Sequence, residues 1–229
     1  MTTPSDLPAA RSDRAQGAPV IGLAGGIGSG KSEVSRALAE AGCVVTHSDD
    51  DVREVLRRKE VRETLVGWWG PSVVGADGEI DRSAIAKIVF ADEDSRRRLE
   101  ALVHPLVEVQ RKKMWEEAAR RGPVAAFVID APLLFEAGLD RKCDAVIFVE
   151  SDESTRLARV KAGRGWDAAE LARREKNQWP LETKRERSDY VIVNNEDVAA
   201  LRRRIRLTLD EILTKSARRQ SRQDWCPAP

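Results

Sequence analysis

The residues whose types and spacing predict chemistry most directly lie near the start of the sequence. Residues 25–32 read GGIGSGKS and match the pattern G-x-x-x-x-G-K-[ST]. Glycines let backbone N–H groups turn toward phosphate oxygens, Lys31 can reach the β- and γ-phosphates, and the Ser32 hydroxyl can ligate Mg²⁺. The segment, here called the phosphate loop, therefore predicts a site for ATP and Mg²⁺. The alternative is a glycine-rich turn without a ligand. It is the weaker one because a strand pattern precedes the motif and a helix pattern follows it.

The predicted nucleotide-binding residues of this loop are Gly26, Ile27, Gly28, Ser29, Gly30, Lys31, Ser32 and Glu33.

Five short apolar runs predict the strands that position the loop. They cover residues 20–24, 43–46, 124–129, 145–149 and 190–193. Apolar rather than alternating strands, separated by helical patterns, indicate a parallel sheet covered on both faces. The predicted fold class is therefore α/β, with a five-stranded parallel sheet flanked by helices. Residues 32–41 read as the helix after the loop, ended by Gly42, and residues 47–50 read as a polar turn.

Uneven spacing between the strands predicts two insertions into this core. Residues 51–122 are helical in pattern and too long for one crossover, so we expect an inserted helical lobe. A smaller, arginine-rich insertion at about 163–185 is expected to form a lid. Both follow the carboxyl ends of strands, where ligands bind in such sheets. The predicted organisation is a disordered leader at 1–18, a folded domain at 19–213 with its core at 19–50, 123–162 and 186–213, and a basic, flexible tail at 214–229.

Composition indicates a soluble globular protein. Hydrophobic residues make up 41% and charged residues 34% of the chain, and the formal net charge is +1. This charge predicts no partnership with nucleic acid or membrane, and no apolar stretch has the length of a membrane span. Three cysteines without ligand or disulfide spacing, and a start without a secretory pattern, predict a cytoplasmic protein. We expect a monomer or a weak homo-oligomer that acts on a small molecule.

Asp49 follows the second predicted strand, on the side of the sheet where the phosphate loop is expected. A carboxylate there can accept a hydrogen bond from an acceptor hydroxyl and orient it toward the γ-phosphorus. A helix N-cap would favour the same residue type. Arg53, one helical turn later, would bind phosphate groups of the acceptor or form a surface ion pair. The residues alone leave these alternatives open.

Two further segments carry candidate residues. Asp130 ends an apolar strand, where a carboxylate would hold Mg²⁺ through water. The apolar residues that follow it, Pro132 and Leu133 among them, would form either a ledge under a ligand or ordinary core. His104 and Pro105 interrupt a helical pattern, and we expect the proline to bend the helix and expose a turn. A lone histidine is otherwise more often structural.

The second insertion carries the candidate lid residues. Arg164, between two glycines, has the best position to neutralise charge on a transferred phosphoryl group. Arg159, Arg173 and Arg174 are weaker candidates, because arginines on helices usually lie on solvated faces. Asn194 follows the last predicted strand, where its amide would read an adenine edge or form a turn.

In this order, the landmarks resemble those of the dephospho-CoA kinase family over about residues 20–213. They are GGIGSGKS at 25–32, Ser48-Asp49 with Arg53, HPLV at 104–107, DAPLLFE at 130–136 and SDYVIVNN at 188–195. Many NTPases share the phosphate loop, whereas the HPL and DxPLLxE elements are more specific. The resemblance implies a P-loop kinase that phosphorylates the 3′-hydroxyl of dephospho-CoA with ATP, giving CoA and ADP in the last step of coenzyme A biosynthesis.

The resemblance also implies roles for individual residues. It identifies Asp49 as the catalytic base or orienter, with Lys31 and Arg164 as the other catalytic residues. It makes the helical lobe the acceptor-binding lobe. The implied substrate-binding residues are Arg53, His104, Pro132, Leu133, Glu136 and Arg174. The chain departs from the family at His47, where an Asp is usual, and at Glu33, where Thr is common.

Two other functions fit parts of the sequence. A nucleoside or nucleotide kinase would have a similar core and lid, but the large lobe favours a bulkier acceptor than a nucleoside. A nucleotide-dependent switch would use the phosphate loop as a sensor, and Asp49 together with the lid arginines argues against it.

Overall fold

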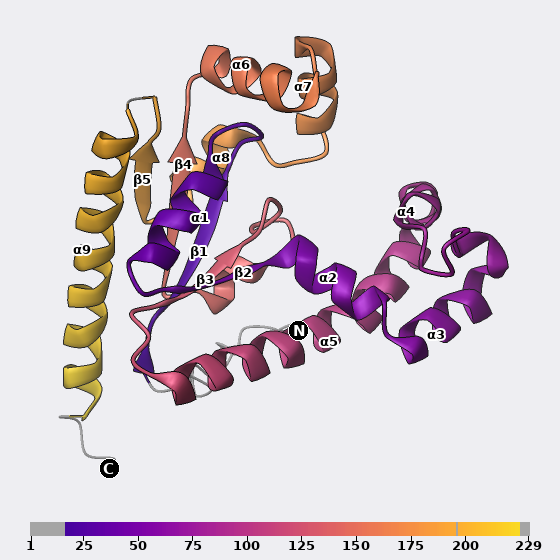
Figure 1. Cartoon of the computed structure of the whole chain (residues 1–229), viewed down its shortest axis with the longest axis horizontal. Helices are drawn as coiled ribbons and strands as arrows, with labels where there is room; N and C mark the ends of the chain where they lie inside the picture. The colour runs from indigo at the N-terminus through magenta and orange to yellow at the C-terminus, as the bar shows by residue number, and fades with distance from the viewer. Residues whose placement is uncertain (1–16, 196, 225–229) are drawn as a thin grey trace, which may run out of the picture. The chain divides into compact units, whose positions relative to one another are not determined.

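The computed structural model describes residues 17–195 and 197–224 and contains one five-stranded sheet (Figure 1). The strands are β1 (Val20–Gly25), β2 (Val44–His47), β3 (Phe127–Asp130), β4 (Ala145–Glu150) and β5 (Tyr190–Val193). Their order across the sheet is β2-β3-β1-β4-β5, and all of them run parallel. The predicted five-stranded parallel sheet is therefore confirmed.

The central position of β1 decides where the phosphate loop lies. β1 pairs with β3 on one side, with Val20 opposite Phe127, and with β4 on the other, with Ile21 opposite Ala145. After β1 the chain forms the edge strand β2. The later strands β3 and β4 then pair with β1, one on each side. Such a reversal of strand order leaves a crevice at the carboxyl ends of the strands, and the phosphate loop follows β1 at this point.

Two compact units can be distinguished, and each is described by itself. The sheet unit comprises the described residues of 17–45 and 118–224, and the helical unit comprises residues 46–117. The helices of the sheet unit are α1 (Lys31–Glu40), α6 (Glu153–Arg164), α7 (Ala168–Glu175), α8 (Leu181–Glu186) and α9 (Val198–Asp224), with a 3₁₀ turn, η3 (Leu139–Lys142). Helix α9 runs alongside β5, and α6 and α7 lie beyond the carboxyl end of β4 (Figure 1).

The core of the sheet unit explains why α1 holds a fixed position after the loop. Val34 and Leu38, one turn apart on α1, are buried in one cluster with Ile205 and Leu209 of α9 and with strand residues such as Ile147. Full burial of one such side chain contributes about 1.5–3 kcal/mol, so the inner faces of α1 and α9 are firmly held. Gly42, with φ of +88°, ends the α1 segment as predicted.

Several boundaries differ from the prediction. The third strand begins at Phe127 rather than at 124, because its partner β1 begins only at Val20, opposite Phe127. Residues 48–50 are not a turn, because α2 already begins at Ser48. Three consecutive acids occupy the first turn of α2, and negative charge stabilises a helix N-terminus. Helix α9 continues beyond residue 213 to Asp224, and Lys215 supports it through an ion pair with Glu211 at 2.7 Å.

The helical unit contains α2 (Ser48–Leu56), α3 (Lys59–Trp69), α4 (Arg82–Ala91) and most of α5 (Glu93–Arg121), with a 3₁₀ turn, η2 (Pro71–Val73). It has its own hydrophobic cluster, in which Val55, Leu65, Ile85, Val103 and Val107 are buried. Asp81 caps α4 by accepting hydrogen bonds from the backbone of Ser83 and Ala84.

The predicted interruption at His104 and Pro105 is wrong. Helix α5 is continuous over 29 residues and contains Pro105. Proline inside a helix costs about 3 kcal/mol, because one backbone bond is lost. Val103 and Val107, which flank Pro105 one turn apart, are both buried, and this packing offsets the cost. His104 and Pro105 are exposed on the same helix.

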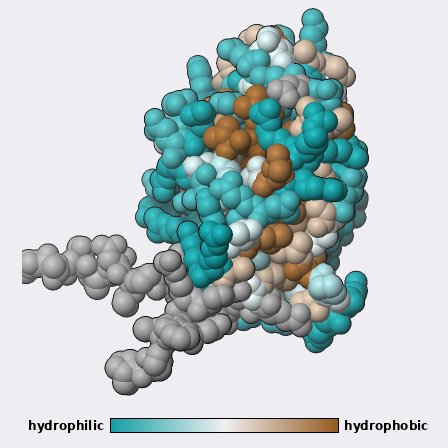
Figure 2. All heavy atoms as spheres, turned by 90° about the vertical axis from the view of Figure 1, so that its left-hand side faces the viewer, coloured by the Kyte–Doolittle hydropathy of each residue, from teal (hydrophilic) through white to brown (hydrophobic). Residues whose placement is uncertain are grey.

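Polar side chains dominate the face of the sheet unit that α9 forms (Figure 2). Hydrophobic residues lie between them in small groups. Among the helices of residues 17–195 and 197–224, none combines the length and the apolar character that a membrane span requires.

Candidate functional site

The phosphate loop adopts a shape that requires glycine at two positions. Gly28 has φ of +77° and Gly30 has φ of +88°, in the left-handed region that other residues rarely adopt. A Cβ at Gly28 would lie 2.7 Å from the carbonyl oxygen of Arg156, and a Cβ at Gly30 would overlap the side-chain nitrogen of Asn194. The neighbouring elements therefore approach the loop too closely for any other side chain.

The carbonyl oxygens of the loop are bound by side chains from distant parts of the sequence. Arg159 of α6 donates from Nη1 to the carbonyl oxygens of Gly28 and Ser29 at 3.4 and 3.2 Å. Arg156 donates from Nη1 to the carbonyl of Ile27 at 3.3 Å. Asn194, buried after β5, donates from Nδ2 to the carbonyl of Ser29 at 2.8 Å. Three consecutive carbonyls thus point toward protein donors.

Because these carbonyls point toward the protein, N–H groups of the loop point to the opposite side. All described peptide bonds are trans, so each N–H points away from the preceding carbonyl. The N–H of Gly30 therefore points away from Arg159 and Asn194, the side chains that donate to the Ser29 carbonyl. The hydroxyl of Ser29 is buried and has no hydrogen-bond partner among the described residues. The loop thus presents N–H groups such as that of Gly30 at the N-terminus of α1, which suits an anion such as phosphate.

The predicted metal residues lie on α1 and β3. Ser32, in the first turn of α1, is exposed. Asp130, the last residue of β3, is buried, and its Oδ2 accepts a hydrogen bond from Ser35 Oγ on α1 at 2.6 Å. A hydroxyl and an oriented carboxylate are the oxygen donors that Mg²⁺ prefers, so the residues present fit this ion.

The segment after Asp130 divides between surface and core. Leu133 is 45% exposed, whereas Leu134 and Phe135 are buried. Glu136 accepts from the backbone N–H of Trp179 at 2.7 Å and forms an ion pair with Lys184 at 2.8 Å.

Lys184 is almost completely buried, at 1% exposure. It also donates to the carbonyl of Pro132 at 3.1 Å and to Oε1 of Gln178 at 3.0 Å. Glu136 and Pro132, both predicted to bind substrate, are therefore joined to each other by a lysine that the sequence did not single out.

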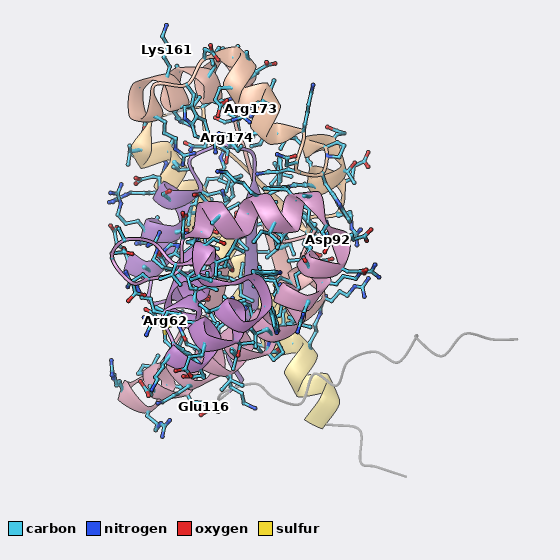
Figure 3. The ribbon with its side chains drawn as sticks, turned by 90° about the vertical axis from the view of Figure 1, so that its right-hand side faces the viewer. Arg62, Asp92, Glu116, Lys161, Arg173 and Arg174 are labelled. Atoms are coloured by element: carbon cyan, nitrogen blue, oxygen red, sulfur yellow. The ribbon has the colours of Figure 1, made fainter. Side chains whose placement is uncertain are left out.

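Two arginines of the predicted lid segment lie over the ring of one tryptophan. Trp166, between α6 and α7, has the guanidinium carbon of Arg174 4.0 Å and that of Arg164 4.8 Å from its ring centroid. Glu170 accepts hydrogen bonds from Arg173 and Arg174. These bonds lower the pKa of Glu170 to about 2, and the bond from Arg173 has the larger effect. Figure 3 labels Arg173 and Arg174 on α7 and Lys161 on α6. Two of the predicted lid arginines, Arg164 and Arg174, are thus exposed and share one aromatic support.

Asp49 and Arg53 belong to α2 of the helical unit. The N-cap residue of α2 is His47, so Asp49 lies inside the first turn and is not the N-cap. Asp49 is exposed, which leaves its carboxylate accessible. Arg53 forms its ion pair with Asp50, at 3.0 Å, rather than with Asp49. His104 belongs to α5 of the same unit and is exposed.

The sequence analysis missed Arg156, although a signal was present. Arg156 and Arg159 are one helical turn apart, directly after the strand that pairs with β1. Two arginines on one helix face, next to an anion-binding loop, indicate a shared task. Arg156 is also paired with Glu175, which ties α7 to α6.

A parallel sheet with this strand order, and a GGIGSGKS loop between its central strand and α1, defines a P-loop kinase fold. The family model described as dephospho-CoA kinase matches residues 19–200. The dephospho-CoA kinase of Geobacillus kaustophilus is 40% identical over 186 residues, which cover 81% of this chain and 92% of the relative. That of Symbiobacterium thermophilum is 43% identical, over 76% of this chain and 73% of the relative.

A solved structure of related sequence has the same fold. The crystal structure of TT1252 from Thermus thermophilus is 32% identical, covers 85% of this chain and 97% of its own, and has a TM-score of 0.72. The chain belongs to the dephospho-CoA kinase family, as the sequence landmarks indicated.

Proposed function

We propose that this chain transfers the γ-phosphoryl group of ATP to the ribose 3′-hydroxyl of dephospho-CoA and releases CoA and ADP. One observation carries the proposal: the family model spans residues 19–200, which include the phosphate loop, the helical unit and the lid segment. The family and its named relatives support the same transfer, the last step of coenzyme A biosynthesis.

The sheet unit binds the nucleotide in this proposal. N–H groups of the phosphate loop surround the phosphates, and Lys31 neutralises the β- and γ-phosphates. Arg156, Arg159 and Asn194 hold the loop carbonyls away from the ligand, which spares ATP the repulsion of those oxygens. Asn194 was predicted to contact the nucleotide itself, and its bond to Ser29 supports an indirect contribution through the loop.

Ser32 and, through water, Asp130 are the residues that we assign to Mg²⁺. When bound, the metal neutralises charge on the phosphate oxygens. The bond from Ser35 fixes the orientation of the Asp130 carboxylate whether or not the ion is present.

The helical unit supplies the acceptor side. Asp49 accepts the hydrogen bond of the 3′-hydroxyl and orients its oxygen for in-line attack on the γ-phosphorus. Arg53 and His104 bind the phosphate and other polar groups of dephospho-CoA. The exposed side chain of Leu133, next to Pro132, offers an apolar surface for the acceptor. Glu136 contributes by holding this segment through Lys184.

The lid acts during transfer. Arg164 and Arg174 bring positive charge to the transferring phosphoryl group and exclude water from it. Their shared contact with Trp166 keeps both guanidinium groups at the tip of the lid segment. We further propose a cytoplasmic protein that acts without nucleic acid or membrane, as a monomer or weak homo-oligomer, a state that light scattering of the purified chain will test.

A coupled ADP-release assay tests the proposed function. Purified chain with ATP and Mg²⁺ receives dephospho-CoA, or a panel of nucleosides and nucleoside monophosphates, and CoA is identified by mass spectrometry. We expect strong stimulation by dephospho-CoA alone, with CoA as product. Stimulation by a nucleoside or monophosphate instead would show that the acceptor is not dephospho-CoA, while the proposed nucleotide site would stand. Slow ADP release with every acceptor would favour a nucleotide-dependent switch.

A further inference from the structure

A buried ion pair within the helical unit joins the first turn of α2 to α5. Arg111 donates from Nη2 to Asp51 Oδ2 at 3.0 Å and to Ser48 Oγ at 3.3 Å. Both charged residues are only 5% exposed. Ser48 and Asp51 are three residues apart and share one face of α2, so one guanidinium binds both ends of this turn.

Asp49 lies between these two residues. Each residue advances about 100° around a helix, so Asp49 points away from the face that binds Arg111. Its carboxylate is exposed, whereas that of Asp51 is buried. The two contacts on either side of Asp49 hold the helix turn that carries its carboxylate.

The ion pair is a poor source of stability. Burial raises the pKa of Asp51 above its ordinary value, and the attraction of Arg111 offsets this effect only in part. A raised carboxyl pKa means that the charged form is less stable in the folded chain than in the unfolded chain. Nε of Arg111 is also buried and lacks an acceptor among the described residues. Replacement of such pairs by well-packed apolar side chains is often neutral or stabilising, so stability alone does not explain the pair.

We propose that Arg111 is a positioning residue that fixes the first turn of α2 and thereby the direction of the Asp49 carboxylate. The proposal rests on the proposed function, in which Asp49 orients the acceptor hydroxyl. Arg111 also lies two helical turns after His104 on α5. The same contact therefore fixes the helix of Asp49 against the helix of His104, the two helices assigned to the acceptor.

A second contact between these segments provides a matched control. Arg58, which precedes α3, donates from Nη2 to Gln110 Oε1 on α5 at 2.6 Å. It too links the chain after α2 to α5, through the residue next to Arg111. Arg58 is not part of the proposed catalytic or binding machinery, and it lies outside α2, the helix that carries Asp49.

The first experiment compares Arg111→Lys with Arg58→Lys in the full chain, with dephospho-CoA as acceptor. A lysine keeps the charge but lacks the planar guanidinium, whose Nη2 is held in place to bind Ser48 and Asp51 together. We expect kcat to fall about tenfold to a hundredfold in Arg111→Lys, with the KM for ATP unchanged, because small misplacement of a reacting group has effects of this size. Arg58→Lys should keep the wild-type kcat. Equal kcat values in the two variants would overturn the proposal.

The second experiment asks whether Arg111 acts through Asp49. In an Asp49→Asn background, Arg111→Lys should cause almost no further loss of kcat, because the group that it positions is already absent. An undiminished loss in that background would contradict the proposal. If Asp49→Asn itself keeps the wild-type kcat, the inference fails while the proposed function stands. If the wild-type chain forms no CoA, the proposed function fails first and the inference with it.

The third experiment separates positioning from stability. Asp51→Leu combined with Arg111→Met replaces the pair by apolar side chains, and we expect a thermal midpoint at or above that of the wild type. The kcat of this double variant should stay as low as that of Arg111→Lys. Recovery of kcat together with the thermal midpoint would mean that the pair is only structural. If the double variant does not fold, the first two experiments decide.

Discussion

Substitution of Gly30 by alanine tests the account of the phosphate loop most directly. The residue has φ of +88°, and an alanine in this region costs about 1–2 kcal/mol. The new methyl group would also displace the amide of Asn194, which donates to the Ser29 carbonyl at 2.8 Å. Loss of that buried bond costs about 1–3 kcal/mol. Gly30→Ala should therefore lower the free energy of unfolding by about 2–5 kcal/mol and weaken ATP binding.

The two contributions can be separated by a second substitution. Asn194→Ala alone should cost about 1–3 kcal/mol, because the Ser29 carbonyl loses a donor. In the double variant the same bond can be lost only once, so its stability should nearly equal that of Gly30→Ala. Urea unfolding of the wild type, both single variants and the double variant measures these differences.

A control and a refuting result follow from the same geometry. Gly163 lies in α6, and an added Cβ would have no neighbour within 4 Å. Gly163→Ala should therefore raise the free energy of unfolding by about 0.5–1 kcal/mol. If the effects of Gly30→Ala and Asn194→Ala are additive, the predicted collision does not occur and the reasoning is wrong.

Two further predictions concern charged groups of the sheet unit. Lys184→Met should destabilise the chain by about 3–5 kcal/mol in thermal unfolding, because the buried carboxylate of Glu136 loses its cation, and Glu136→Gln should recover part of that loss. A Lys184→Met variant as stable as the wild type would refute this. Glu170 has a pKa of about 2, below its ordinary 4.5, so its contribution to stability is complete above pH 4.5 and is lost as the pH falls toward 2. In Arg173→Ala, carboxyl NMR titration should show the pKa of Glu170 moving toward 4.5, and an unchanged value would exclude Arg173 as the main cause.

The features that the sequence predicted correctly are those that depend on residues adjacent in the chain. The phosphate loop and the strand and helix around it depend on one continuous segment, and the five apolar strands follow from composition and length. The turn predicted at Pro105 was wrong, because Val103 and Val107 pack into the core of the helical unit, and this packing is a tertiary effect. No local pattern reports such an effect.

Contacts between distant residues could not be predicted from the sequence. Asn194 binds a carbonyl 165 positions earlier in the chain, and Arg159 binds the same loop across 130 positions. An asparagine after a strand and an arginine on a helix have many uses, and only the strand order brings these two to the loop. The same holds for Arg111 and Asp51, which lie 60 positions apart and which the sequence analysis did not single out.

The distance along the chain between Asn194 and the phosphate loop has a consequence for synthesis of the protein. Ser29 of the loop is translated 165 residues before Asn194, the residue whose amide holds the Ser29 carbonyl. Native contacts of such long range form late in folding. A nascent chain that ends before β5 will therefore carry the complete GGIGSGKS motif and still bind ATP poorly. The affinity for ATP thus reports whether the last strand has docked.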